Sequence, residues 1–476
     1  MFSKKQTGGK TAKDARTKDR QRVEKSAVRM KKTKPMKQQN PSVNKSTIKR
    51  TVLQTLPYEQ FVSEYIMLVK SNVKIGKQTA NLYSKSYLVP DINYSSLPTG
   101  EKETKLMAYI DLLNGFDSSA SVQVTLHNTK INRKDFEQRV LLQYKDDGND
   151  DERKEFNGIL HDRLMLGQNG IQCKKYITIT VSAIDFEAAN TKFLNYESHL
   201  NLCTQKLGTE MIPLKANERV RILCDIFRGV NTDLSLITRE EFARRSEKML
   251  CCPEYFEFKK DYFMFNEKYA RCLYFQKLPT SSVTDSIFKD ILETNQTMII
   301  TKNIEFVDTA DAIELVRRQI TNMKQEEITK TKAAANSARG AFIDPIEGTE
   351  LAENKAQAYE FLEDLQGRNQ KMTLCQFIIM ITADSHDELE KNTETLRIIA
   401  RKNQITLSVA PYRQEQAFAS FIQVKHSILR QRTPICPKTQ SKAVLATAYS
   451  VNFLHKLMFV IPTIVFTPIV ITQSVT

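Results

Sequence analysis

Three groups of residues in this chain have types and spacings that could support chemistry, and the first is a pair of glycine–lysine sequences. A phosphate-binding loop reads GxxxxGKS or GxxxxGKT, because its backbone amides wrap the phosphates and its lysine reaches the outer ones. Gly9-Lys10-Thr11 has Lys4 where the first glycine should stand. Gly76-Lys77 has Ser71 there and no hydroxyl residue after the lysine. No GxGxxG is present either, so the sequence predicts no ATP-binding loop and no nucleotide cofactor.

Eight cysteines and six histidines form the second group, because these side chains can hold a metal ion or act as nucleophile and base. No CxxC or HExxH sequence occurs, and the adjacent Cys251 and Cys252 have no second pair at zinc-site spacing, so we interpret them as buried thiols. Cys375 and His386 are the residue types of a thiol–imidazole catalytic pair. Cys375, however, lies in an apolar run typical of a core strand, so we interpret it as a core residue. We predict no catalytic residue, no cofactor site and no metal site.

The acidic run from Asp146 to Glu152 is the third group, and its composition resembles a calcium site. It lacks the EF-hand order of alternating ligands, a central glycine and a terminal glutamate. We therefore interpret it as a solvated linker that leads into a helix ending at Gly167.

The clearest structural unit is a strand, a helix and a return strand. From Ile177 to Ala183 apolar residues alternate with Thr and Ser, which predicts a half-buried strand. Asp185 then has the position of a helix N-cap, and apolar residues recur every three or four positions until Gly208 ends the helix. Residues 211–214 are expected to return as a strand.

The same unit recurs near the end of the body. Residues 374–383 form a nearly continuous apolar run, typical of a central strand, and Asp384 has the N-cap position of the next helix. Residues 405–410 are the expected return strand. We therefore predict an α+β fold of two related strand–helix–strand halves with mixed or antiparallel sheets. A first subdomain is expected at 51–250 and a second at 251–422.

Residues 308–370 predict two helices joined by a turn. The first helix begins with an apolar stripe that ends at Met323, and from Lys324 to Arg339 no stripe remains. Two ordinary surface helices would explain the pattern. We favour a helical hairpin whose tip projects from the body, because a projecting polar tip is suited to docking a partner.

The charge of the chain is concentrated at its ends. Residues 1–50 hold 17 basic and three acidic residues, a net charge of +14, with Phe2 as the one aromatic residue. Such a segment buries too little apolar surface to offset its ordering entropy, so we predict a disordered basic arm. Its expected partners are anionic lipid or DNA. The lysines proposed for this contact are Lys4, Lys5, Lys31, Lys32 and Lys34.

The tail 423–476 has an unusual composition, with no acidic residue and no glycine. Its apolar run at 457–472 is shorter than the roughly 20 residues of a membrane span, and it contains Pro462 and Pro468. Two explanations remain open, a membrane anchor and a reading frame that has shifted near Val424. On the second explanation, residues 425–476 are expected to have no packed place on the domain. Because Met1 is followed by a Lys-rich polar stretch without an apolar region, no signal peptide is predicted and the expected location is cytoplasmic.

From about residue 77 to 418 the chain resembles the N-terminal, non-motor half of the conjugative type IV secretion ATPase family, the TrbE/CagE/VirB type. The versions in integrative conjugative elements of Firmicutes are the most similar. The stretches that carry the resemblance are Asp91-Ile-Asn-Tyr94, Phe116-Asp-Ser-Ser119, Gly167-Gln-Asn-Gly170, Lys175-Tyr-Ile-Thr178, Phe361-Leu-Glu-Asp-Leu-Gln-Gly-Arg-Asn369, Ala383-Asp384 and Gln414-Glu-Gln416.

The resemblance implies a scaffold and docking domain that attaches the ATPase to membrane components of the conjugation channel, at the inner face of the cell membrane. In the family a motor with a phosphate loop follows this half. Here the resemblance stops near Gln423, so the chain itself is not expected to be an enzyme, and ATP is expected only for a full-length member. Self-association is a further expectation. The alternative function is a membrane-tethered basic nucleic-acid-binding protein.

Removal of residues 1–50 should abolish binding to anionic vesicles and to DNA and leave the body folded. Each basic residue near an anionic surface contributes about 1 kcal/mol, so the loss of this segment removes most of the attraction. Vesicle co-sedimentation and DNA anisotropy measure binding, and circular dichroism checks the fold. Unchanged binding after the deletion would contradict the prediction.

Overall fold

A computed structural model describes part of the chain: residues 51–75, 78–90, 97–130, 141–165, 171–229, 247–277, 286–294, 296–336, 345–367, 371–421 and 448–450. Contacts divide the chain into Met1–Arg50 and Thr51–Thr476, and all the described residues belong to the second unit. The predicted basic arm and its five lysines lie outside the described residues, as does the predicted tail apart from residues 448–450.

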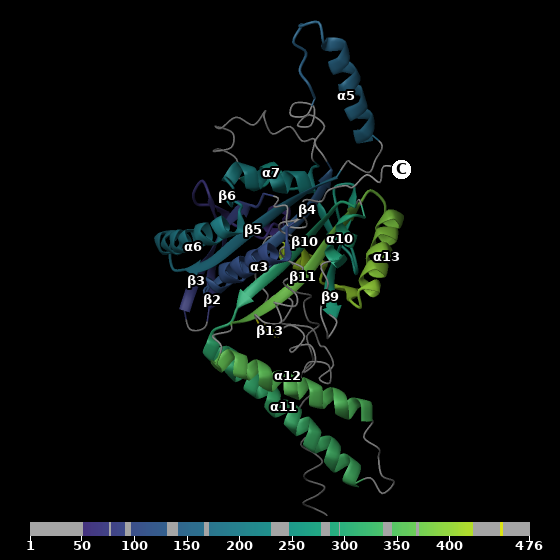
Figure 1. Ribbon diagram of the computed structural model, residues 1–476. Helices are drawn as coiled ribbons and strands as arrows, with labels where there is room; N and C mark the ends of the chain where they lie inside the picture. Colours follow the sequence, from purple (N-terminus) through teal and green to yellow (C-terminus); the bar gives the residue numbers. More distant parts are fainter. Residues whose placement is uncertain are drawn as a thin grey trace, which may run out of the picture. The chain divides into compact units, whose positions relative to one another are not determined.

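The described part of Thr51–Thr476 is built around one antiparallel sheet (Figure 1). Ten strands follow each other across it, and three more pair beside this path. The α+β class is thus confirmed, with a single sheet in place of separate ones. In spatial order the ten strands are β1 (Gln60–Phe61), β2 (Ile66–Ile75), β3 (Gln78–Leu88), β5 (Ile171–Ala183), β4 (Ala120–Lys130), β10 (Met298–Phe306), β11 (Met372–Ala383), β9 (Lys268–Lys277), β8 (Phe263–Phe265) and β7 (Phe256–Phe258).

The prediction of two related halves is confirmed. In the first half β5 leads through α6 (Phe186–Leu207) to β6 (Ile212–Pro213), and β6 pairs with β3. In the second half β11 leads through α13 (His386–Lys402) to β12 (Thr406–Val409), and β12 pairs with β9. The strand order β3–β5–β4 in one half therefore corresponds to β9–β11–β10 in the other.

One hydrogen-bond pattern repeats in both halves at equivalent places. The Ser182 backbone N–H and side-chain hydroxyl both donate to the Ser119 carbonyl oxygen, at 3.1 and 3.3 Å. The Thr382 backbone N–H and hydroxyl donate to the Thr297 carbonyl oxygen in the same way, at 3.1 and 3.4 Å. The halves thus share details of side-chain bonding as well as topology.

The halves meet where β4 pairs antiparallel with β10, and we call this pairing the seam. Ser121 lies opposite Glu305 at one end of the seam, and Asn128 lies opposite Met298 at the other. The sheet consequently runs without interruption through both predicted subdomains, 51–250 and 251–422.

The predicted N-cap is correct for one of the two equivalent helices and lies one residue away from the observed N-cap in the other. Asp185 caps α6 as predicted, since its carboxylate accepts the Ala188 N–H at 2.8 Å. The prediction for Asp384 is wrong, because the Ser385 hydroxyl accepts the Glu388 N–H at 3.2 Å and is the N-cap of α13. Asp384 stands one residue before the cap, where its own N–H donates to the Glu388 carboxylate.

Helices cover both faces of the sheet. One face is mostly apolar and packs against α3 (Thr99–Asn114), α6, α10 (Ser286–Leu292) and α13. The other face packs against α7 (Ala216–Phe227), α9 (Glu247–Cys251) and α14 (Gln414–Ala419). The other helices in the described residues are α2 (Val52–Thr55), α5 (Asp150–Met165), α11 (Thr309–Asn336) and α12 (Pro345–Gly367). None of the helices in the part of the chain described here combines the length and apolar character that crossing a bilayer requires.

Part of the tail has a place on the sheet. β13 (Ala448–Ser450) pairs antiparallel with Met372–Leu374 at the start of β11. This pairing contradicts the prediction that no part of residues 425–476 packs on the domain. It occurs where β9 leaves the edge of β11 open, because β9 pairs with β11 only from Ile378 onward.

Gly115, the C-cap of α3, allows α6 to approach the end of that helix. A Cβ atom at this position would lie 2.0 Å from Nε2 of His199, and that nitrogen is 3.0 Å from the Asp111 carbonyl oxygen. The Gly115 backbone is helical, with φ −71°, so the constraint here is contact with the histidine and involves no unusual dihedral angle.

Gly115→Ala should lower the free energy of unfolding by about 1–2 kcal/mol, because the imidazole must rotate out of its contact. Gly100→Ala, on the same helix, is the matched control, because nothing lies within 4 Å of a Cβ there. Urea unfolding measures both variants. The penalty should disappear in a His199→Ala background, and an equal penalty in both backgrounds would refute the steric explanation.

Candidate functional site

The first candidate site is the helical hairpin predicted at 308–370, and the structure contains its two helices side by side (Figure 1). They are α11 (Thr309–Asn336) and α12 (Pro345–Gly367). At its base the hairpin has its own apolar core, in which Ala312 and Val316 pack with Leu365. Met372 and Leu374 of β11 belong to the same cluster, so the hairpin base is joined directly to a central strand.

Beyond this base the described side chains of the first helix are exposed. Met323 is the last buried residue of α11 among those whose side chains are described, and residues 324–329 are all exposed. This change falls where the apolar stripe ends in the sequence, and it confirms that the stripe covers only the base of the hairpin.

Polar contacts link the two helices beyond the base. Lys355 Nζ lies 2.8 Å from a Glu327 carboxylate oxygen, and Lys324 Nζ lies 5.5 Å from the centre of the Tyr359 ring. Two large side chains remain open to solvent, Ile328 at 51% and Tyr359 at 41% exposure. Residues 324–329 of α11 together with Lys355 and Tyr359 of α12 are here called the outer hairpin. They present charged, aromatic and aliphatic groups to solvent, a mixture that is suited to contact with a protein.

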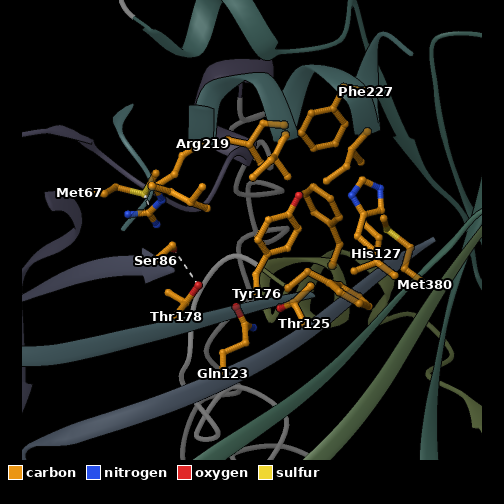
Figure 2. A pocket seen from close by; sticks show the side chains of 17 residues that line it. Met67, Ser86, Gln123, Thr125, His127, Tyr176, Thr178, Arg219, Phe227 and Met380 are labelled. Atoms are coloured by element: carbon orange, nitrogen blue, oxygen red, sulfur yellow. Dashed lines mark hydrogen bonds between the residues drawn. The ribbon is translucent and has the colours of Figure 1, made fainter. Parts of the chain in front are cut away.

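The second candidate site is a cavity of about 100 Å³ between α7 and the sheet, which the sequence did not predict (Figure 2). Its floor comes from the central strands, and its roof from α7 with the loop just before it and from the residues at and after α14. The floor residues are Met67, Ser86, Gln123, Thr125, His127, Tyr176, Thr178, Ile299 and Met380; the others are Leu214, Arg219, Ile222, Leu223, Ile226, Phe227, Phe418 and Phe421.

Arg219 is the charged residue of this cavity, and it is only 8% exposed. Its guanidinium donates to the Ser84 carbonyl oxygen and hydroxyl, both at 3.0 Å, and lies 3.5 Å from Sδ of Met67. The Phe61 ring centre is 5.6 Å away. Burial lowers the pKa of Arg219 to about 10, because the charged form is removed from water.

His127 and Tyr176 supply polar but uncharged groups to the cavity (Figure 2). Burial is the main cause that lowers the pKa of His127 to about 4, and the nearby charge of Lys174 adds to it. Burial likewise raises the pKa of Tyr176. Both side chains are therefore neutral at pH 7, so Arg219 carries the charge of the cavity.

Two side-chain amides, those of Gln123 and Asn303, connect the cavity to the seam. Gln123 and Asn303 lie opposite each other on β4 and β10, and the Gln123 side chain donates to Asn303 Oδ1 at 2.8 Å. Both amides also donate to the Ser420 carbonyl oxygen, at 2.9 and 3.3 Å. The chain is thus held to the seam directly after α14.

Apolar and polar residues alternate along β4, and this alternation is the local signal in the sequence for which side chains lie on each face of the strand. Val122, Val124 and Leu126 face the apolar core as the pattern predicts, while His127 lies in the cavity on the opposite face. A polar face of a strand usually contacts solvent. Here α7 covers it, and nothing in the local pattern of β4 indicates that cover.

The cysteine and histidine residues do not form the catalytic pair considered from the sequence. Cys375 is buried in β11 beside Thr373, and burial raises the pKa of its thiol. His386 begins α13 and lies against the Tyr262 ring, with 5.0 Å between ring centres. A different thiol–imidazole contact joins Cys203 and His199 at 3.6 Å, and its signal in the sequence is the spacing of four residues, one turn of α6.

The Cys203–His199 pair lacks the lowered thiol pKa that a nucleophilic pair requires. Burial raises the pKa of Cys203, whereas a reactive cysteine needs a lowered pKa to provide thiolate. Cys251 is buried as predicted, and burial raises its pKa to about 11. The same prediction is wrong for Cys252, which is only partly buried.

Two carboxylates of the acidic run are paired with an arginine of the same chain. Asp147 and Asp150 both accept hydrogen bonds from the Arg153 guanidinium, and these bonds are the main cause that lowers the pKa of Asp147 to about 2. α5 begins at Asp150, as expected for a linker that leads into a helix. Within the described ranges, no three His, Cys, Asp or Glu side chains are grouped so that they could hold a metal ion.

Comparison with known proteins adds no family assignment. A scan of protein-family models finds no match to this chain, and neither does a search of curated proteins. The choice of a function therefore depends on the chemistry of the hairpin and the cavity.

Protonation of His127 should destabilise the fold in acid. Its pKa is near 6.5 in an unfolded chain and about 4 in the folded protein, so the unfolded state binds the proton first as pH falls. The free energy of unfolding should drop by roughly 3 kcal/mol between pH 7 and pH 4 from this residue alone. His127→Gln should flatten that part of the profile measured by urea unfolding.

His161→Gln is the control for this prediction, because His161 is exposed on α5. It should follow the wild-type profile. An unchanged slope in His127→Gln would show that other groups cause the acid sensitivity.

Proposed function

We propose that this chain acts as the docking and scaffold part of a conjugative-transfer, type IV secretion ATPase. The observation that carries the proposal is the α11–α12 hairpin, which is inserted between two central strands and exposes residues 324–329 of its first helix. The resemblance in the sequence supports the same function, since that part of the family attaches the motor to membrane components of the channel. The partners are these components, and the site of action is the inner face of the cell membrane.

The mechanism of docking follows from how the hairpin is connected. Its base shares an apolar cluster with Met372 and Leu374 of β11, and β11 is paired along its length with β10. A partner bound to the outer hairpin would therefore be held by the whole sheet. This role needs no catalytic residue, and the 476 residues contain no phosphate-binding loop.

Nucleic-acid binding is the second candidate function, and the +14 net charge of residues 1–50 is the observation that favours it. Binding of that kind should weaken steeply as salt rises, because the release of condensed counterions drives it. Docking through Ile328 and Tyr359 should depend much less on salt, because burial of apolar surface contributes most of the binding.

Ile328→Asp combined with Tyr359→Ser should weaken binding to the membrane components of a conjugation channel, reconstituted in vesicles, by at least about tenfold. The change removes two exposed apolar groups and adds a charge that the partner surface must desolvate. Both side chains are about half exposed and neither belongs to a buried cluster, so the fold should be unaffected, which thermal unfolding checks.

Leu194→Asp combined with Leu202→Ser is the matched control, since both leucines are exposed on α6, at 56% and 63%. It should bind like the wild type. Equal weakening by both double variants, or by neither, would contradict docking through the hairpin.

A further inference from the structure

We propose that the cavity beneath α7 binds a short-chain carboxylate of acetate to propionate size, with its carboxylate on Arg219 and its carbon end among the apolar residues of the roof. This inference is independent of the docking function, because the cavity lies on the sheet face under α7 and the hairpin belongs to a separate apolar cluster.

The buried charge of Arg219 is the first indication of an anion. Buried cations in proteins are normally paired with anions, because an isolated charge away from water is costly. Arg219 is almost fully buried, yet the acceptors it contacts, the Ser84 oxygens and Met67 Sδ, are all neutral. Among the described residues, no carboxylate lies within ion-pair distance of its guanidinium. An anion in the cavity would supply the missing charge.

The shape of the cavity indicates what kind of anion fits. A protein cavity of about 150 Å³ holds benzene, which has six carbon atoms, so about 100 Å³ holds roughly four or five non-hydrogen atoms. Acetate has four such atoms and propionate has five. Longer acids would have to displace the roof of α7, and a polyanion such as phosphate would bring more charge than one arginine balances.

The lining also places its charged group toward one end of the cavity and several aromatic and apolar side chains toward the other. Figure 2 shows Arg219 near Met67 and Ser86, while Phe227 and Met380 lie at the side of His127. Leu223 and Phe418 add further apolar surface. A carboxylate with one or two carbon groups matches this arrangement. A bare halide would leave the apolar part of the cavity unfilled.

The other explanation for Arg219 is a purely structural one, in which it fastens α7 to β3 through Ser84. A fastening arginine needs no ligand, so its effect on stability should not depend on the anion in solution. The carboxylate proposal instead predicts stabilisation that saturates with concentration, since a ligand that binds only the folded state shifts unfolding by mass action.

The test uses the full chain and sodium propionate. The melting temperature should rise with propionate and reach a plateau, while equal concentrations of sodium chloride and of neutral propionamide should not reproduce the rise. Acetate should act in the same way and hexanoate should not, because it exceeds the cavity. Fluoroacetate, which is the size of propionate, provides a direct readout, since its fluorine NMR signal should broaden with the protein and sharpen again when propionate displaces it.

Two variants and one control decide the location of binding. Arg219→Met and Ile226→Phe should each weaken propionate binding at least tenfold, the first by removing the charge and the second by filling the cavity from its roof. Arg221→Met on the same helix should bind as the wild type, because Arg221 is partly exposed and lies 4.0 Å from Asp225. If Arg219→Met does not fold, Ile226→Phe gives the answer alone.

The proposal is overturned by the absence of a saturable carboxylate effect beyond that of chloride. It is also overturned by wild-type binding in Ile226→Phe or Arg219→Met. In either case Arg219 is a structural fastener only.

Discussion

The antiparallel pairing of β4 with β10 is the interaction on which the rest of the structure depends. It joins the two halves, and its register from Ser121–Glu305 to Asn128–Met298 sets which side chains face which layer. A shift by one residue would turn Val122 and Val124 toward α7 and bring Gln123 into the apolar core. The paired amides of Gln123 and Asn303 help to hold this register, because both donate to the Ser420 carbonyl oxygen.

The same pairing decides where the inserted helices emerge. In each half an insertion follows the strand at the seam: α5 lies between β4 and β5, and the α11–α12 hairpin lies between β10 and β11. Because β4 and β10 are antiparallel neighbours, their final residues, Lys130 and Phe306, point toward opposite ends of the sheet. The two insertions therefore start from opposite ends of the seam. The proposed docking element is thus one of two elements at equivalent positions, and it is the one that shares an apolar cluster with a central strand.

Despite their common topology the halves are stabilised differently. Arg271 on β9 lies opposite Ile381, and at the equivalent place of the first half Tyr83 lies opposite Val181. Arg271 is fully buried and donates to both Glu390 carboxylate oxygens, at 2.6 and 2.9 Å, and to Asp261 at 3.1 Å. One half thus holds its helix with a buried arginine and two carboxylates, while the other uses an aromatic side chain in the apolar core. Arg219 differs from Arg271 because no such carboxylates accompany it among the described residues.

Local patterns in the sequence determined the strand–helix–strand units, the Asp185 cap and the end of the apolar stripe at Met323, because alternation, capping and helical periodicity act over a few neighbouring residues. The lack of a phosphate-binding loop is likewise a property of the sequence alone. Tertiary structure decided the rest. The cavity gathers Met67, Arg219 and Met380 from distant parts of the chain, and the seam pairs residues about 180 positions apart. Which strands become neighbours depends on the packing of the whole sheet, and no short-range pattern in one sequence encodes it.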